Sequence, residues 1–225
     1  MKCISVSNMR ESDAYTIENF VPSLELMYRA AWGVYKAASW NGKTAIVVGS
    51  GNNGGDGFAL ACILQERGFS CTVYTVSDRL SGDSAHFAKI AAEAGVPIRP
   101  FERGCLDGYT TVVDCLLGTG FSGGLRENYR KAIEGINSSG AFVISVDINS
   151  GMNGDTGLAE LAVYSDLTVT IGYVKYGLIA PNAGNYMKRL ICVDIGIVLV
   201  REEGVITDEN CPAWLDRNII DGLNE

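Results

Sequence analysis

The stretch TAIVVGSGNNGGDG at residues 44–57 decides how this chain folds. A run rich in β-branched residues leads into a glycine-rich turn, and the apolar pattern that follows predicts a helix beginning at about Gly54. In such a strand–loop–helix unit, backbone N–H groups and the positive end of the helix receive an anionic or nucleotide ligand. Gly49, Gly51 and Gly54 satisfy the G-x-G-x-x-G pattern, which is a weak signal by itself.

The informative part of this stretch is NNGGDG at residues 52–57. A dehydrogenase loop keeps the space before its helix free of acidic side chains, because the pyrophosphate sits there. Here Asp56 falls in the first helical turn and follows the two amides Asn52 and Asn53, which makes direct pyrophosphate docking unfavourable. Asp56 is also a residue type that caps helices, and capping and ligand binding are compatible roles.

Composition narrows the class of protein. The chain has 225 residues, 47% of them hydrophobic, and a net charge of −8, so it can bury a substantial core and lacks the basic face that nucleic acid requires. We see no signal sequence and no apolar run near the roughly 20 residues of a membrane helix. The seven cysteines form no C-x-x-C pair. We expect a soluble cytoplasmic protein with no nucleic-acid or membrane partner.

Strand-like and helix-like patterns alternate along the chain, which predicts βαβ crossovers and a mainly parallel sheet covered on both faces. The expected strands are 44–48, 71–76, 111–116, 141–146, 167–171 and 190–195. The expected helices are 54–67, 82–94 and 125–137, preceded by two amino-terminal helices at 8–19 and 23–38. We expect a single domain over residues 1–225, with a polar appendage or loose tail in the last 25 residues.

Two later strands also end in an acid. VVDCLLGTG at 112–120 places Asp114 before a glycine-rich loop, and VISVDINSG at 143–151 places Asp147 before a turn. A lone acid at a strand end is often a cap or turn residue. Because parallel strands end at the same edge of a sheet, Asp56, Asp114 and Asp147 would share one crevice. They would repel one another unless a cation sat among them or one of them held a proton.

Together these segments resemble the NAD(P)H-hydrate epimerase family, also called the YjeF N-terminal domain family, over nearly the whole chain. The matching segments are MRE at 9–11 with Asp13, LM at 26–27, GNNGGDG at 51–57, VD at 113–114, GTG at 118–120, DINSG at 147–151, DTG at 155–157, DLTVTIG at 166–172 with Lys175, and VDIG at 193–196. The family commonly has proline where this chain has Asn149, so we expect a less rigid turn before Ser150.

The resemblance implies a three-layer α/β/α Rossmann-like sandwich, usually dimeric, that interconverts the R and S forms of hydrated NADH and NADPH and binds potassium. It implies Asn53, Asp114 and Ser150 as potassium ligands, whose oxygen atoms suit a hard cation. It also implies a separate NAD(P)H-hydrate dehydratase as a pathway partner. The implied substrate-binding residues are Asn52, Asn53, Gly54, Gly55, Asp56, Gly118, Thr119, Gly120, Phe121, Ser122, Gly123, Gly124 and Asp147.

Our hypothesis for the chemistry makes Asp147 the acid–base group. It would protonate the ring hydroxyl, stabilise the cation left when water departs, and deprotonate the incoming water, with neighbouring acids raising its pKa. Ring opening and reclosure is a rival route. Lys175, which matches a family lysine, would meet a phosphate or an acidic pocket residue; the alternative is a solvated loop residue.

Two other classes of protein remain open at this stage. An NAD-dependent oxidoreductase would explain the glycine-rich loop and could use Asp78 for ribose, but it leaves the Asn52-Asn53 pair and Asp56 unexplained. A non-catalytic nucleotide-binding or dimerisation module is the other alternative, since the fold also serves in RNA-decapping scaffolds.

Overall fold

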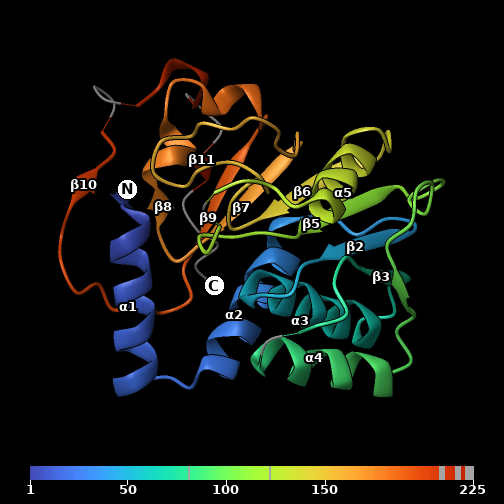
Figure 1. Cartoon of the computed structure of the whole chain (residues 1–225). Coiled ribbons are helices and arrows are strands. Elements are labelled where there is room, and N and C mark those ends of the chain that lie inside the picture. Colours follow the sequence, from blue (N-terminus) through green and yellow to red (C-terminus); the bar gives the residue numbers. More distant parts are fainter. Residues whose placement is uncertain (81, 122, 208–210, 216–218, 221–225) are drawn as a thin grey trace.

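The computed structural model describes residues 1–80, 82–121, 123–207, 211–215 and 219–220. Within these ranges, eight strands form one parallel sheet in the order β11-β9-β7-β6-β5-β2-β3-β4 (Figure 1). Their bounds are β2 Thr44–Val48, β3 Cys71–Thr75, β4 Ile98–Pro100, β5 Thr111–Cys115, β6 Phe142–Val146, β7 Leu167–Ile171, β9 Leu190–Val193 and β11 Ile219–Ile220. All six expected strands are present and in parallel register, which confirms the predicted α/β architecture.

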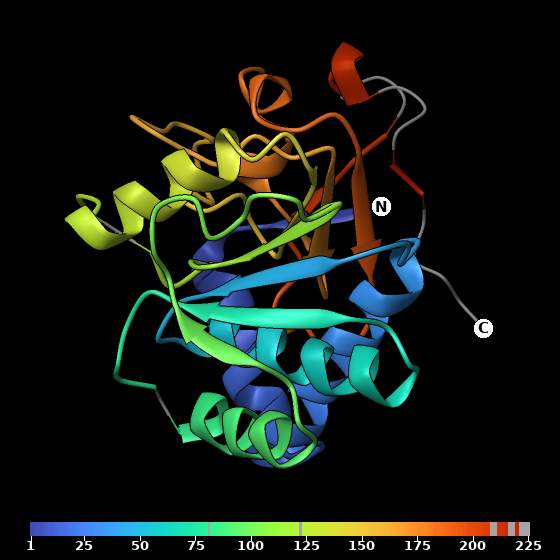
Figure 2. The same ribbon diagram turned by 90° about the vertical axis from the view of Figure 1, so that its right-hand side faces the viewer.

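Helices cover both faces of this sheet. The bounds are α1 Val6–Asn19, α2 Ser23–Ala37, α3 Asn52–Glu66, α4 Gly82–Glu93 and α5 Glu127–Asn137. Figures 1 and 2 show α2, α3 and α4 on one side of the sheet and α5 on the other. Each side has its own apolar core, because alternate residues of a strand point to opposite faces: in β5, Val113 packs toward α3 whereas Val112 packs toward α5.

The amino terminus departs from the expectation of two helices ahead of the first strand. It begins with β1 (Lys2–Ile4), which pairs in parallel with β8 (Val174–Lys175) and antiparallel with β10 (Gly204–Val205). These strands are two or three residues long, too short for a period-two pattern to be visible. The consequence for the site is that Lys175 lies in a small second sheet, in register with Ile4.

Helix α1 packs through a polar stripe. Asn8, Ser12 and Thr16 recur every four residues, are fully buried, and bind the chain that follows β9. The amide nitrogen of Asn8 donates to the Arg201 carbonyl at 2.9 Å, and the Thr16 hydroxyl accepts from the Val198 N–H at 2.9 Å. Residues 198–201 are therefore fastened to α1, and much of the appendage or loose tail expected in the last 25 residues lies outside the described residues. In the described part of the chain, none of the helices combines the length and apolar character needed to cross a membrane.

The glycine-rich turn after β2 is required by close backbone packing. A Cβ at Gly49 would lie 1.9 Å from the carbonyl oxygen of Leu116, and one at Gly54 would lie 2.1 Å from the carbonyl oxygen of Gly49. Helix α3 begins at Asn52, two residues earlier than predicted, so both asparagines belong to its first turn. Gly49 and Gly54, the first and third glycines of the pattern, thus allow α3 to pack against β2 and the loop after β5. At Gly51, by contrast, an added Cβ would have no neighbour within 4 Å.

This packing predicts opposite outcomes for two glycine substitutions in the same turn. Gly49→Ala should lower the free energy of unfolding by about 1–3 kcal/mol or more, because the clash is with backbone atoms that have no rotamer to adopt. Gly51→Ala, at the position before α3, should cost less than about 1 kcal/mol. Urea unfolding of both variants checks this, and equal losses would show that the close approach at Gly49 does not constrain the fold.

Candidate active site

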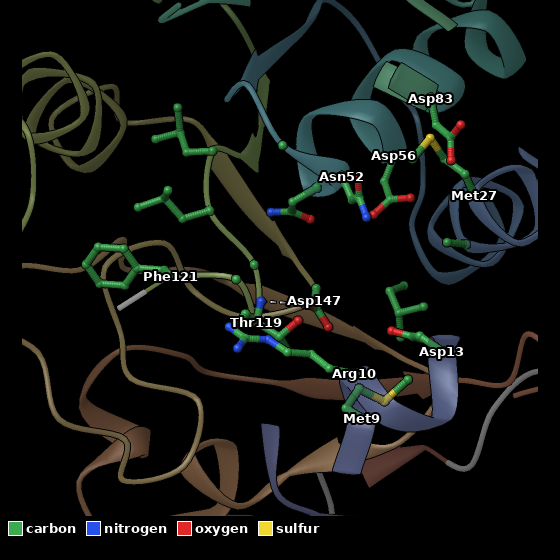
Figure 3. Close-up of a pocket in the computed structure, with 18 of the residues that line it drawn as sticks. Met9, Arg10, Asp13, Met27, Asn52, Asp56, Asp83, Thr119, Phe121 and Asp147 are labelled. Atoms are coloured by element: carbon green, nitrogen blue, oxygen red, sulfur yellow. Dashed lines mark hydrogen bonds between the residues drawn. The ribbon is translucent and has the colours of Figure 1, made fainter. Parts of the chain in front are cut away.

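A pocket of about 690 Å³ opens at the carboxyl edge of the main sheet. Its walls come from α1, α2, the start of α3, the loop after β5, and the residues that follow β6 and β7 (Figure 3). Strands β2, β5 and β6 are neighbours in the sheet, so their carboxyl ends bring the three motifs of the sequence together as predicted.

Asp147 is the first residue after β6 and lies in the pocket. Its φ of +69° makes it the one non-glycine residue with a positive φ among those the structure describes. A non-glycine residue in this region is strained, and such strain persists where surrounding contacts hold the residue in place. Its own N–H donates to the Val169 carbonyl at 2.8 Å, which fixes the backbone while the carboxyl group turns into the pocket.

The carboxylate of Asp147 is held by two donors. Lys175 Nζ lies 2.6 Å from Oδ1, and the Thr119 N–H donates to Oδ2 at 3.1 Å (Figure 3). Lys175 is completely buried and also donates to the Thr170 hydroxyl at 3.1 Å and the Ile171 carbonyl at 2.7 Å. Of the two interpretations of Lys175, the solvated loop residue is wrong: its partner is an acidic pocket residue, whose negative charge it compensates.

Three other carboxyl groups line the same pocket, those of Asp13, Asp56 and Asp83. Burial raises the pKa of Asp13 to about 6, with Lys175 opposing the shift and Asp147 adding to it. Burial also raises the pKa of Asp56 well above its usual range, and Asp147 and Asp13 raise it further. Asp13 and Asp56 are therefore the pocket acids that burial favours in the protonated form. The sequence analysis gave Asp13 no role; its spacing of four residues from Met9, another pocket residue, was the available signal.

Asp114 lies beneath the pocket, fully buried in β5. It accepts hydrogen bonds from the hydroxyls of Ser150 at 2.5 Å and Ser145 at 2.9 Å, and from the N–H groups of Ser150 and Leu116 at 3.0 and 3.2 Å. Burial raises its pKa, and these hydrogen bonds oppose the shift. Two of the three residues implied as potassium ligands, Asp114 and Ser150, are therefore in direct contact.

Of the three acids expected in one crevice, Asp56 and Asp147 line the pocket, whereas Asp114 does not. The sequence left two ways to relieve their repulsion, a cation or a proton on one of them, and the structure favours the proton. Asp114 is enclosed by hydroxyl and N–H donors, Asp147 is paired with Lys175, and burial favours the neutral form of Asp56. Among the described residues there is no group of three or more His, Cys, Asp or Glu side chains placed to hold a metal ion. Repulsion among these acids therefore gives no argument for a cation.

The side chain of Asn53 supports a bound cation on other grounds. It is 7% exposed, and neither its side-chain oxygen nor its nitrogen has a hydrogen-bond partner. A buried amide without partners is costly, and it calls for a ligand at that point. Asn53 packs beside Gly118, where an added Cβ would lie 3.3 Å from the Asn53 Cβ and 2.9 Å from Asp147 Oδ2. The donor set of Asn53, Asp114 and Ser150 consists of amide, carboxylate and hydroxyl oxygens, which fits a hard cation.

The substrate-binding residues implied by the resemblance divide into two groups. Those lining the pocket are Asn52, Asn53, Asp56, Gly118, Thr119, Gly120, Phe121, Gly124 and Asp147. Gly54 and Gly55 do not line it: they are buried in close packing against Gly49 and Met27, respectively. Gly123 lines a smaller neighbouring hollow of about 130 Å³. Ser122 lies outside the described residues.

Asn149 does not loosen its turn as expected. It is fully buried; its side-chain nitrogen lies 2.9–3.0 Å from the Val163 carbonyl, the Ser165 hydroxyl and the Tyr186 carbonyl. Its side-chain oxygen accepts from the Thr168 hydroxyl at 2.7 Å. These contacts fix the turn between Asp147 and Ser150 from beneath, so a polar side chain stabilises the segment where the family commonly has proline.

Arg10 is a pocket residue that the sequence analysis did not assign. From α1 it donates a hydrogen bond to the Thr119 carbonyl at 2.6 Å, so it joins the amino-terminal helix to the glycine-rich loop after β5 (Figure 3). The same loop residue therefore contacts Asp147 through its N–H and Arg10 through its carbonyl. No local pattern predicts this contact, because it spans 109 residues.

Comparison with known proteins agrees with this architecture. Residues 23–177 match the family model described as YjeF-related protein N-terminus. The chain is 36% identical over 207 residues to an NAD(P)H-hydrate epimerase of Rhodopirellula baltica, covering 87% of this chain and 85% of the relative. It is 37% identical over 203 residues to a protein of the same name from Oenococcus oeni, covering 86% of this chain and 96% of the relative.

Longer relatives and a solved structure extend the comparison. The chain is 36% identical over 213 residues to the bifunctional NAD(P)H-hydrate repair enzyme Nnr of Coxiella burnetii; the match covers 92% of this chain but 44% of that protein. The crystal structure of yeast ynu0 superposes with a TM-score of 0.75 at 19% identity, covering 91% of this chain and 98% of that one, and shows the same fold. The chain therefore belongs to the family of YjeF-related protein N-termini.

Proposed function

We propose that this protein is an epimerase that interconverts the R and S forms of hydrated NADH and NADPH. The observation that carries the proposal is the carboxylate of Asp147, fixed at the pocket by Lys175 and the Thr119 N–H in a strained backbone conformation. Relatives that match most of the chain are named NAD(P)H-hydrate epimerases. A pocket of about 690 Å³ falls within the roughly 300–1,000 Å³ typical of small-molecule sites.

The pocket supplies the groups that such a reaction needs. In the route that we propose, inversion at the hydroxylated ring carbon proceeds by loss of the hydroxyl as water, driven by the ring nitrogen lone pair, and by addition of water to the other face. Asp147 would stabilise the delocalised cation and exchange a proton with the oxygen, since an ionised group fixed in advance needs no reorganisation during the reaction. Lys175 would act by holding the Asp147 carboxylate in place. Apolar side chains of Met9, Leu26 and Ile195 would exclude bulk water.

The same proposal includes a potassium ion held by Asn53, Asp114 and Ser150. The unpaired amide of Asn53 and the contact between Asp114 and Ser150 support it. When bound, a monovalent cation supplies positive charge beside the pocket and fixes oxygen ligands. Asn53 lines the pocket directly, so its orientation would link ion binding to substrate binding.

We also propose a pathway partner, an oligomeric state and a cellular location for this protein. The bifunctional repair enzymes among the relatives suggest a separate NAD(P)H-hydrate dehydratase as partner in the same repair sequence. We infer a homodimer and a cytoplasmic location. All seven cysteines are free thiols in the structure, which suits a reducing compartment.

The central test is Asp147→Asn, assayed by epimerisation of chromatographically separated S and R NADH hydrate. The substitution keeps the size of the side chain and removes the charge that Lys175 compensates, so turnover should fall roughly 10²–10⁴-fold. Asp78→Asn removes an exposed carboxyl outside the pocket and should keep full activity. Full activity in Asp147→Asn would refute the assignment; binding of the hydrate by the wild type without acceleration would favour a non-catalytic module.

Potassium should stabilise the protein independently of catalysis. Binding to the folded state raises stability by RT ln(1 + [L]/Kd), so the unfolding midpoint should be higher in potassium chloride than in choline chloride at equal ionic strength. In Asn53→Ala this difference should shrink, because one oxygen ligand is lost. Thermal unfolding of both proteins in both salts measures it, and an equal midpoint shift in the two proteins would exclude Asn53 as a ligand.

A further inference from the structure

Four carboxyl groups line the pocket from four different elements, one of them Asp83 on α4. Figure 3 shows Asp147 after β6, Asp13 on α1 and Asp56 on α3, all beside the same space. The charge of Asp147 raises the pKa of Asp13 and that of Lys175 lowers it, and both Asp147 and Asp13 raise the pKa of Asp56. Because they project from separate elements, these groups approach a bound ring from different directions.

The carboxyl group of Asp13 differs from that of Asp147 in its hydrogen-bond partners. Both oxygens of Asp147 are engaged by Lys175 and the Thr119 N–H, whereas the Asp13 carboxyl accepts no hydrogen bond from another described residue. Asp13 is nonetheless half-buried against Met9 and Ile17, which lie one turn before and after it on the same pocket-facing side of α1. We therefore expect the Asp13 carboxyl group to form its hydrogen bond with the bound ligand.

In the proposed inversion, proton transfer takes place on both faces of the ring, which one carboxyl group cannot reach. Water leaves from one face of the ring and returns to the other, and a side chain fixed on one side reaches one face. We propose that Asp13 is a second catalytic residue, which exchanges a proton with the oxygen on the face of the nicotinamide ring turned away from Asp147. This inference rests on the proposed epimerase function and deepens it.

The proton and electron balance closes with two carboxyl groups. The protonated member gives its proton to the ring hydroxyl, the C–O bond breaks with its electron pair leaving in water, and the ring nitrogen lone pair stabilises the cation. Water then adds to the opposite face, forming a new C–O bond and giving a proton to the second carboxylate. One proton has moved from one carboxyl group to the other, and the reverse conversion or exchange with solvent restores the starting state.

Asp13 suits this role better than Asp56 does. The pKa of Asp13, about 6, keeps both of its forms accessible near neutral pH, whereas burial, Asp147 and Asp13 all raise the pKa of Asp56 well above its usual range. The charged and titratable side chains that line the pocket with Asp13 are Arg10, Asp56, Asp83, Arg126, Tyr129, Asp147 and Lys175. Glu11, Tyr15 and Glu18 also belong to its helix.

The test follows oxygen exchange and inversion separately in Asp13→Asn, using H₂¹⁸O as solvent. In the wild type, each inversion delivers one solvent oxygen to the product. In the variant, inversion should fall about 10²-fold or more, because the far face has no proton acceptor. The epimer whose hydroxyl faces Asp147 should still exchange its oxygen with solvent while keeping its configuration. For that epimer the ratio of label uptake to inversion should rise at least about tenfold. The other epimer should show neither oxygen exchange nor inversion. Chromatography of the S and R forms with mass spectrometry measures both.

Further variants separate catalysis from folding. Asn resembles the protonated, neutral form of Asp13, and a carboxyl group whose pKa is raised by folding destabilises the folded state once pH exceeds that pKa. Asp13→Asn should therefore unfold no earlier than the wild type at pH 8. Asp13→Glu should partly restore inversion, and Glu18→Gln, an exposed position on the same helix, should change neither rate. In the wild type, kcat/KM for inversion should fall as pH rises through about 6, and this limb should be absent in Asp13→Asn.

The outcomes are distinguishable. Equal losses of exchange and inversion in Asp13→Asn, or no loss of either, would overturn the assignment of Asp13 while leaving the epimerase proposal intact. A wild-type protein that accelerates neither process over the buffer rate would overturn the proposed function, and the assignment with it.

Discussion

The ion pair between Lys175 and Asp147 is the interaction on which the site depends. It joins two sheets, because Lys175 belongs to the small sheet of β1, β8 and β10 whereas Asp147 directly follows β6 of the main sheet. A fully buried ammonium group is tolerated only when a carboxylate and further acceptors compensate it, and Thr170 and Ile171 complete its contacts. The pair thereby holds the Asp147 backbone in a conformation that it would not adopt alone.

A layer of buried polar side chains supports this pair from within the sheet. Asp114, Ser145 and Thr168 lie in register across β5, β6 and β7, where apolar residues would be the ordinary choice. Asp114 binds Ser145 and Ser150, and Thr168 binds Asn149. Since every member has a partner, the layer fixes the turn from Asp147 to Ser150 without the cost of unsatisfied polar groups. Asn53 is the exception beside it, and an unpaired amide at that place is the feature that favours a bound cation.

Helix α1, near the amino terminus, forms a second wall of the pocket. Its buried stripe of Asn8, Ser12 and Thr16 binds the segment after β9, so the pocket-facing side with Met9, Asp13 and Ile17 is held over the sheet edge. Arg10 adds a contact to the loop after β5. The arrangement supplies carboxyl groups from two directions, which the chemistry of an inversion at one carbon requires.

The sequence by itself determined the main sheet, most of the helices and the place of the site. Runs such as TAIVV at 44–48 are β-branched and continuous, which is what a strand buried on both faces requires, and parallel strands necessarily end at one edge. It therefore brought Asn53, Asp56, Asp114 and Asp147 to one end of the sheet. Only the tertiary structure decided which of these side chains are paired, which are enclosed by hydrogen-bond donors, and which carboxyl groups burial favours in the protonated form. Strands of two or three residues carry no readable period, so the placement of Lys175 was hidden, and the contact of Arg10 with Thr119 spans 109 residues. Whether a carboxyl group is paired, enclosed by donors or left neutral depends on burial and on neighbours distant in sequence, which no local pattern encodes.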